Sequence, residues 1–417
     1  MVRALSERAA SALTRLDALY PDIEALYLDL HEHPELSLQE EQTAAKVAAR
    51  LEALGYEVAT GIGGTGVVGL LRNGSGPTVM LRADMDALPL EEKTGLPYAS
   101  KVTAKDRNGA LVPVMHACGH DVHTACLVGV ADLLAGARAS WQGTLMLVFQ
   151  PAEEVANGAA AMVKDGLFTR FPKPDYALGQ HTTPHPTGML TFCPGYAASS
   201  CDNVTIRLFG QGGHGSMPQV TIDPVVMAAS LVMRLQTIVS REVTPQEVAV
   251  VTVGSIKSGT KHNIIPDEAV LELTVRTYKE EVRALVLAAI ERMAKAEALA
   301  SNAPKEPEIA LVDATPSLYN DPDLTERMTR ALRAYFGAEQ VIQVPPMTPS
   351  EDFPYFTQEG VPSFFYDFGV INAEQFKAAN GQVPANHSPY FAPDREPSLK
   401  MGMEAFTVSA LELLQAS

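Results

Sequence analysis

The chain has 417 residues, of which 46% are hydrophobic, and its formal net charge at pH 7 is −17. This length and apolar content predict two or three domains with large buried cores. The negative charge argues against nucleic acid and anionic membranes as partners, because both would be repelled.

The N-terminal segment shows no sign of export or membrane insertion. Residues 1–20 place Arg, Glu and Asp among Leu and Ala at helical spacing, without the basic start and apolar core of a signal peptide. No apolar run approaches the ~18 residues that a membrane span needs. The 4 cysteines are too few for a disulfide framework. We therefore expect a cytoplasmic protein with no membrane partner.

The first part of the chain alternates predicted helices with predicted strands. Ser37 and Glu40 have the spacing of a capping box at the start of the second helix. Apolar periodicity predicts helices at residues 23–33, 37–54 and 124–135, and strands at residues 66–72, 78–82 and 143–150. Such alternation is typical of a mixed or parallel α/β sheet.

After residue 194 the pattern changes to that of a small, separate domain. Val204, Ile206 and Leu208 alternate with polar residues, as in a half-buried strand. Strands are predicted at residues 202–209, 247–256, 269–277 and 308–312, and helices at residues 224–240 and 279–300. The order β-α-β-β-α-β is the ferredoxin-like pattern, a split βαβ unit.

The chain then returns to the earlier pattern, with helices predicted at residues 323–336 and 401–415. The sequence therefore predicts an α/β protein in which a smaller domain is inserted into a larger one. The larger domain, with a mixed central sheet, comprises residues 1–193 and 313–417, and the inserted ferredoxin-like domain comprises residues 194–312. Segments on either side of the insertion would meet in such a fold.

Residues suited to bind metal are concentrated in residues 115–123, which read MHACGHDVH. One thiol, three imidazoles and a carboxylate in so short a segment suit a divalent transition metal better than a packing motif. Further donors follow at Glu153, Glu154, His181 and His387. The last two flank the predicted insertion, so the fold would bring them together.

The number of donors favours two metals over one. Cys118 and His120 are two positions apart and point to the same side if the segment is extended; Glu154, His181 and His387 complete a set of five. One four-coordinate catalytic metal needs three protein ligands and a water, whereas two metals can share a bridging ligand. A neutral imidazole cannot bridge through one nitrogen, so the bridge is Cys118 or Glu154, and we favour the thiolate. The donor set suits Zn, and Mn, Co or Ni could occupy it.

Two further acidic residues, Asp84 and Asp86, share a face at the end of a predicted strand. One interpretation is that such a carboxylate orients a metal-binding histidine and raises its basicity. The other is turn chemistry before Pro89, and both stay open. Residues 350–352 (SED) look instead like a helix N-cap with acids in the first turn.

A glycine-rich segment at residues 210–215 (GQGGHG) follows a predicted strand and matches G-x-G-x-x-G. A dinucleotide site also needs a helix that begins at once and an acidic residue about 20 positions later. Pro218 and Pro224 interrupt the segment, and Asp223 comes too early. We therefore expect a turn that presents His214, for which a purely structural role is equally open.

Six motifs follow one another along the chain: residues 81–89 (LRADMDALP), 115–121 (MHACGHD), 149–154 (FQPAEE), 212–215 (GGHG), 263–266 (NIIP) and 350–353 (SEDF). Together they resemble the amidohydrolase branch of the aminoacylase/carboxypeptidase metallohydrolases. This branch includes hippurate hydrolases, N-acyl-amino-acid amidohydrolases, N-acetyl-diaminopimelate deacetylases and plant indole-acetyl-amino-acid hydrolases. The resemblance extends from residue 26 to the C-terminus.

The resemblance implies a catalytic domain with two metals and a ferredoxin-like lid through which relatives often dimerise. The family's ligand positions fall on the five donors counted above, and its general base falls on Glu153. His214 falls on a lid histidine that reaches the partner's active site in dimeric relatives. Asn263 falls where relatives polarise the substrate carbonyl, and Arg276 near a lid arginine that binds the substrate carboxylate. Without the resemblance, Arg276 is equally well explained as a solvated charge at a strand end.

The predicted function is a metal-dependent amidohydrolase that cleaves the amide bond of N-acyl amino acids, of the hippurate or N-acetyl-amino-acid type. A metal-bridged hydroxide would attack the amide, with Glu153 as general base. His214 and Asn263 would stabilise the oxyanion. We expect a homodimer through the lid, or a larger homo-oligomer. The sequence specifies neither the acyl group nor the amino acid.

Three alternatives remain. The substrate could be an N-acetylated diamino acid such as N-acetyl-diaminopimelate. Cys118 could act as a nucleophile, although His120, two positions away in an extended loop, is badly placed as its base. The chain could also bind metal without catalysis, although a pure binding site needs no base such as Glu153.

Overall fold

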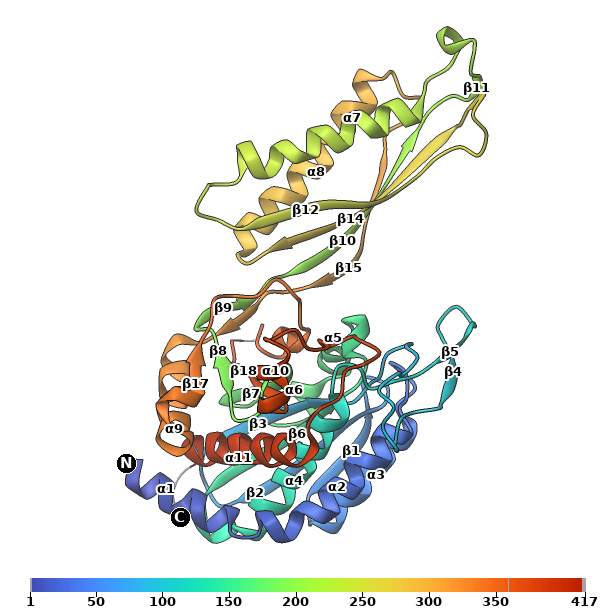
Figure 1. The fold of residues 1–417 in the computed structure, drawn as a ribbon. Coiled ribbons are helices and arrows are strands. Elements are labelled where there is room, and N and C mark those ends of the chain that lie inside the picture. Colours follow the sequence, from blue (N-terminus) through green and yellow to red (C-terminus); the bar gives the residue numbers. More distant parts are fainter. Residues whose placement is uncertain (1, 359, 415–417) are drawn as a thin grey trace. The chain divides into compact units, whose positions relative to one another are not determined.

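The computed structural model describes residues 2–358 and 360–414 and divides the chain into two compact units (Figure 1). Unit 1 comprises Met1–Ala197, Tyr319–Pro345 and Asp352–Ser417, and unit 2 comprises Ala198–Leu318 and Pro346–Glu351. Unit 2 is thus inserted into a unit that is discontinuous in sequence. The domain limits given above, at residues 193/194 and 312/313, stay a prediction.

A mixed sheet organises unit 1, with its strands in the order β1-β2-β6-β3-β7-β18-β8-β17. The central strands β6, β3, β7 and β18 run parallel, and β1 and β2 add one edge by antiparallel pairing. The bounds of these strands are β1 (Glu57–Ile62), β2 (Gly66–Asn73), β3 (Thr78–Asp84), β6 (Gly143–Gln150), β7 (Tyr176–Pro186), β8 (Leu190–Phe192), β17 (Val341–Gln343) and β18 (Ser363–Ile371). A separate hairpin pairs β4 (Thr103–Lys105) with β5 (Leu111–Pro113), and β9 (Gly195–Ala198) and β16 (Leu318–Asn320) lie where the chain passes between the units.

The helices of unit 1 pack on this sheet and on one another. Their bounds are α1 (Val2–Leu13), α2 (Leu16–Glu32), α3 (Glu41–Ala53), α4 (His120–Gly136), α5 (Gly158–Lys164), α6 (Leu167–Arg170), α9 (Pro322–Phe336), α10 (Ala373–Ala378) and α11 (Arg395–Leu413). Helix α4 is apolar nearly all round because it packs against β3 as well as α2 and α11. Its burial fixes the first turn of the helix, which carries His120.

Four helix starts differ from the prediction: α2 begins at Leu16 rather than at residue 23, α11 begins at Arg395 rather than at residue 401, and α3 and α4 differ as follows. Helix α3 begins at Glu41 rather than at Ser37, and the predicted capping box is wrong because both of its side chains bond elsewhere: the Ser37 hydroxyl donates to Asp86, and the Glu40 carboxylate accepts from backbone N–H groups. Helix α4 begins at His120, earlier than predicted. At the other end of the chain, α11 runs from Arg395 to Leu413, and residue 415 of the predicted helix lies outside the described residues.

Unit 2 has a four-stranded antiparallel sheet in the order β12-β14-β10-β15. Its main elements are β10 (Cys201–Phe209), α7 (Pro224–Thr237), β12 (Ala249–Lys257), β14 (Glu268–Thr277), α8 (Glu280–Ala300) and β15 (Glu308–Thr315), and a small ribbon pairs β11 (Gly213–His214) with β13 (Ile264–Ile265). Alternate residues of β10 and β14 are buried with apolar residues of both helices, as the alternating pattern predicted. Among the described residues, no helix has both the length and the apolar character to cross a bilayer.

Candidate metal centre

Three neighbouring strands of unit 1 deliver polar side chains to one edge of the sheet. The parallel strands β6, β3 and β7 lie side by side, and the register aligns Asp84 at the end of β3 with Gln150 at the end of β6. The chain after β6 carries Glu153 and Glu154, and β7 carries His181. The carboxyl ends of parallel strands are the usual place for a ligand site in an α/β sheet.

The start of α4 and the residues just before it add two more donors, in a conformation that the sequence did not predict. Cys118 and His120 do not lie in an extended segment, because Gly119 between them is left-handed with φ 82° and caps the helix. A Cβ on Gly119 would also lie 2.5 Å from the hydroxyl oxygen of Thr182. Only glycine therefore fits between these donors, and the turn brings Cys118, His120 and Glu154 close together.

The structure brings all five predicted ligands together around the thiol of Cys118. The Sγ atom lies 3.5 Å from Nε2 of His181 and 3.3 Å from Nε2 of His387. Oε1 of Glu154 lies 3.4 Å from Nε2 of His387 and 3.9 Å from Nε2 of His120. The central place of the thiol is the geometry that a bridging ligand needs.

The charges of this cluster fit a bound cation. Burial disfavours a Cys118 thiolate, but the imidazoles of His181, His120 and His387 outweigh burial and hold the thiol pKa well below its usual value. Burial and the neighbouring Cys118 raise the pKa of Glu154. A negative charge on Cys118 thus disfavours a negative charge on Glu154. A metal ion bound between them would stabilise both charges.

His120 gives a second sign that the cluster fits a metal ion. The ring is fully buried, and within the described part of the chain neither ring nitrogen has a hydrogen bond of good geometry. Nδ1 lies 3.3 Å from Oδ1 of Asp86, so this carboxylate is placed to orient the ring. Nε2 then faces the cluster as a donor, which is the arrangement of a metal-binding histidine with a supporting carboxylate.

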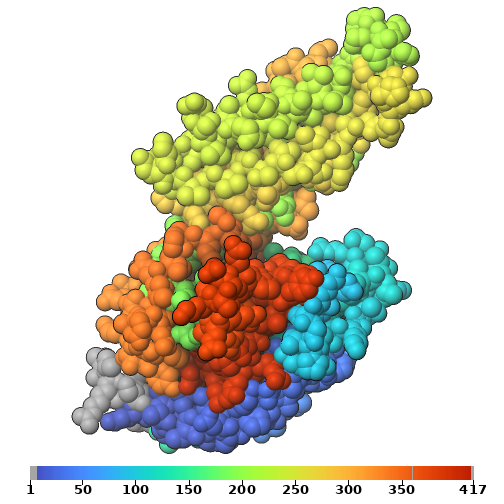
Figure 2. Space-filling model, in the orientation of Figure 1, coloured from blue at the N-terminus to red at the C-terminus, as the bar shows by residue number. Residues whose placement is uncertain are grey.

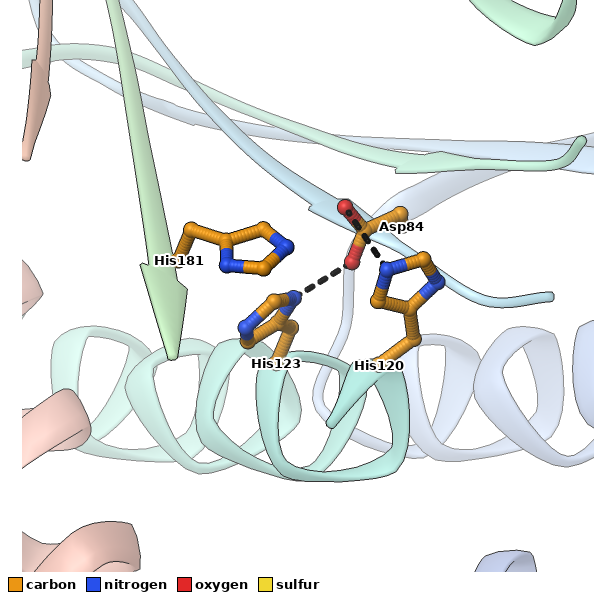
Figure 3. Close-up of side chains that lie close together, drawn as sticks. All are labelled: Asp84, His120, His123 and His181. Carbon is orange, nitrogen blue, oxygen red and sulfur yellow. Dashed lines mark hydrogen bonds and ion pairs between the residues drawn. The ribbon is translucent and has the colours of Figure 1, made fainter. Parts of the chain in front are cut away.

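His123 lies beside the cluster, but its two ring nitrogens bond groups outside the set of five donors (Figure 3). Figure 3 shows Asp84 between His120 and His123, with His181 facing them from β7. Nδ1 of His123 lies 2.5 Å from Oδ1 of Asp84, and its Nε2 accepts the backbone N–H of Thr182. Burial outweighs Asp84 and lowers the pKa of His123 to about 3, so the ring is neutral and both nitrogens are occupied. Asp84 thus supports His123, and Asp86 is the carboxylate nearer to His120.

A buried network fixes Asp84 in turn. Arg82 donates to Asp84, Gln150 and Asp352, and all four side chains are inaccessible to solvent. Asp352 also accepts the backbone N–H of Ala159. The predicted helix N-cap at residues 350–352, with acids in the first turn, is wrong, because the short 3-10 helix begins only at Phe353, has no acid in its first turn and receives no cap from the side chain of Asp352. Its charge balances the buried Arg82 instead.

Asn386 joins the loop that carries His387 to the other ligand segments. Its amide donates to the backbone oxygens of Cys118 and Thr182, each at 3.2 Å. The backbone N–H of His387 donates to the oxygen of Ala117 at 2.8 Å. These bonds hold His387, whose side chain is 57% exposed, against the start of α4.

The three remaining predicted residues lie in unit 2. His214 is exposed on β11, whose pairing with β13 places it beside Asn263, and the N–H of Gly215 donates to the oxygen of Asn263. The N–H of Ser216 donates to Nδ1 of His214, which leaves the proton of the neutral ring on Nε2. Arg276 is half-buried on β14. The glycines run into β11 (Gly213–His214), which is followed by a turn and a short 3-10 helix at Pro218–Val220, and the next α-helix, α7, begins only at Pro224.

Sequence reasoning missed two residues near this centre. His31 was assigned no role, yet it is buried and bonds Asp121, the residue after His120, at 2.6 Å. The available signal was its spacing from Ile23 and Tyr27, which predicts a shared buried helix face. Glu40 was assigned to a capping box, although its carboxylate is fully buried and reaches the segment before Glu153.

Comparisons with known proteins show which family this chain belongs to. The model of a family described as Peptidase family M20/M25/M40 matches residues 80–411. Hippurate hydrolase of Campylobacter jejuni is 40% identical over 82% of this chain and 86% of its own length. N-acetyl-L-cysteine deacetylase of Bacillus subtilis is 37% identical over 88% of this chain and 84% of its own length. The crystal structure of the Bacillus subtilis YXEP protein, described as a dinuclear metal binding peptidase from the M20 family, is 32% identical, with a TM-score of 0.78 over 95% of this chain and 99% of that chain.

Proposed function

Because this chain belongs to peptidase family M20/M25/M40 and is a metallo-amidohydrolase, we propose that it hydrolyses the amide bond of N-acyl amino acids. The observation that carries the proposal is the cluster of donors around the thiol of Cys118, with Oε2 of Glu153 3.9 Å from Nε2 of His120. A hippurate hydrolase and an N-acetyl-L-cysteine deacetylase among the relatives support this substrate class.

Two metal ions would be held by Cys118, His120, Glu154, His181 and His387, with the thiolate as the shared ligand. When bound, such ions supply a Lewis acid for the amide carbonyl and a water whose pKa is lowered to about 7. The mixed thiolate, imidazole and carboxylate donors suit Zn, and Mn, Co or Ni remain candidates. The metal in the YXEP relative supports a pair of ions here.

Glu153 is the proposed general base. Its carboxylate lies beside the cluster, and the N–H of Glu153 donates to Asp86, which fixes the residue in place. In this role the carboxylate takes a proton from the attacking water and passes it to the leaving amine nitrogen. His214, through its Nε2–H, and Asn263, through its amide, would donate to the carbonyl oxygen as negative charge develops there. Arg276 would bind the substrate carboxylate.

We also propose that the protein forms a homodimer through unit 2. Helix α7 exposes Val226 and Met233, which are seven positions apart and therefore lie on one helix face. The residues of α7, yellow-green by the colour bar, form part of the surface of unit 2 that Figure 2 shows. Strand β12 is at an edge of the sheet and exposes Val250 and Ile256. Apolar side chains on an open edge favour pairing with a second copy. The cytoplasmic location stays a prediction.

Metal removal tests the proposed function. Protein treated with a chelator and then dialysed should lose hydrolysis of N-benzoylglycine and N-acetyl amino acids, and added Zn, Mn, Co or Ni should restore it. N-acetyl-diaminopimelate belongs in the same assay, because a preference for it would select the diamino-acid alternative. Metal-free protein that still cleaves these amides would support Cys118 as a nucleophile and reject the proposal. Metal-loaded protein that cleaves none of them would indicate a binding protein.

A further inference from the structure

The turn that carries Glu153 and Glu154 has an unusual backbone. Ala152, just before them, has a left-handed backbone with φ 54° and ψ 39°. Residues other than glycine rarely adopt this conformation. Ala152 is fully buried. Such a conformation persists only where the surrounding structure holds it, so the contacts of this turn decide where Glu153 and Glu154 lie.

Three consecutive backbone N–H groups of this turn donate to two carboxylates. The N–H of Ala152 donates to Oε1 of Glu40 at 2.9 Å. The N–H groups of Glu153 and Glu154 donate to Oδ1 and Oδ2 of Asp86, each at 3.1 Å. Backbone amides that converge in this way form an anion site, and here the chain fills it with its own side chains.

The position of Glu40 is fixed independently of the turn. It directly precedes α3, its oxygen Oε1 also accepts the N–H of Leu38, and its Oε2 accepts the hydroxyl of Thr65. Ser37, three residues earlier, donates its hydroxyl to Asp86 at 2.6 Å. The segment 37–40 therefore fixes both carboxylates that hold the turn, although it contributes no side chain to the donor cluster itself.

We propose that Glu40 is a positioning residue, which holds Glu153 and Glu154 at the metal centre through the N–H of Ala152. The inference rests on the proposed function, in which Glu154 binds metal and Glu153 acts as base. Loss of the Glu40 carboxylate leaves a buried N–H without an acceptor and removes a support of the left-handed turn. A displacement of about 1 Å at a catalytic group can lower the rate ~100-fold.

Three variants test the role of Glu40. Glu40→Ala removes both acceptors, and Glu40→Gln keeps an oxygen for Ala152 and a polar atom for Thr65. Glu41→Ala is the matched control, because Glu41 is the exposed neighbour of Glu40. We expect kcat to fall ~100-fold in Glu40→Ala with KM little changed, and to stay near the wild-type value in Glu40→Gln and Glu41→Ala. If Glu40→Ala does not fold, Glu40→Met keeps the volume and tests the same loss of acceptor.

Two readouts are independent of turnover. Competition with a chelating dye should show weaker Co binding in Glu40→Ala than in Glu40→Gln, and hydrogen exchange should be faster at the Ala152 amide. Wild-type protein that cleaves no N-acyl amino acid would overturn the proposed function, while these two readouts would still test Glu40. Unchanged kcat, Co affinity and Ala152 exchange in Glu40→Ala, or equal losses in Glu41→Ala, would overturn the positioning role.

Discussion

At the scale of single residues, Glu153 and Glu154 are neighbours in sequence for which we propose different tasks. Both follow β6, and both backbone N–H groups donate to Asp86. Each carboxylate has one oxygen 3.9 Å from Nε2 of His120, Oε2 in Glu153 and Oε1 in Glu154. Oε1 of Glu154 also lies 3.4 Å from Nε2 of His387. Substitutions that remove one charge at a time can therefore separate proton transfer from metal binding.

The first prediction concerns this pair. Glu153→Gln should keep its bound metal but lower kcat by ~10²–10⁴-fold, because the amide cannot accept the proton of the attacking water. Glu154→Gln, the matched control, should instead lose metal affinity, since a proposed ligand is removed. Metal content by elemental analysis and kcat with N-benzoylglycine distinguish the two effects. Full turnover in Glu153→Gln would remove this residue from the proposed mechanism.

At the scale of elements, a buried charge cluster joins α2 to the start of α4. Nδ1 of His31 on α2 lies 2.6 Å from Asp121 in the first turn of α4, and its Nε2 lies 3.2 Å from Glu92. Burial disfavours the charged imidazole, but the hydrogen bonds to Asp121 and Glu92 outweigh burial and raise the pKa of His31 to about 9. A protonated His31 therefore stabilises the folded state through two carboxylates.

A pH dependence of stability follows. Because the folded pKa of His31 is raised above the unfolded value of about 6.5, its contribution is complete below that pH and is lost as pH rises through about 9. The difference in unfolding free energy between wild type and His31→Gln should fall by about 3 kcal/mol between pH 6 and pH 10. Urea unfolding of the metal-loaded protein at both pH values measures it.

His33, the residue at the C-terminal end of the same helix, offers a control for His31. Its Nδ1 lies 3.0 Å from Asp29, but the two side chains are 55% and 43% exposed. An exposed pair of this kind contributes little to stability. His33→Gln should therefore change the unfolding free energy little, and a difference for His31→Gln that does not vary with pH would contradict the buried charge cluster.

At the scale of the whole molecule, unit 2 has apolar side chains that stay exposed to solvent in the single chain. Val226 is 65% exposed and Met233 is 71% exposed, on a helix whose other face is buried in the core of unit 2. Unit 1 has its own separate core. The chain therefore does not need a partner to bury its cores, and the exposed face of α7 is available to a second copy.

The last prediction tests this association. The wild type should sediment with twice the monomer mass, and the double variant Val226→Glu, Met233→Glu should sediment as a monomer, because charges on the joined faces would be desolvated. Leu299→Glu is the control, since Leu299 is 83% exposed on α8; this variant should stay dimeric. A wild-type monomer at micromolar concentration in analytical ultracentrifugation would reject the dimer.

Much of the fold could be predicted from the sequence, because periodicity is a local property. The alternation at Val204, Ile206 and Leu208 predicted a strand with one buried face, and β10 has that pattern. The predicted strand at residues 143–150 coincides with β6. The six motifs gave the family, which the matching family model confirms.

The helix starts and the supporting contacts were decided only by the tertiary structure. Ser37 and Glu40 fit a capping box by spacing, but Asp86 and the N–H of Ala152, far away in sequence, compete successfully for their side chains. Cys118 and His120 meet because Gly119 turns left-handed against Thr182, not because the segment is extended. Spacing determines which residue types can meet, whereas hydrogen-bond partners distant in sequence determine which side chains do.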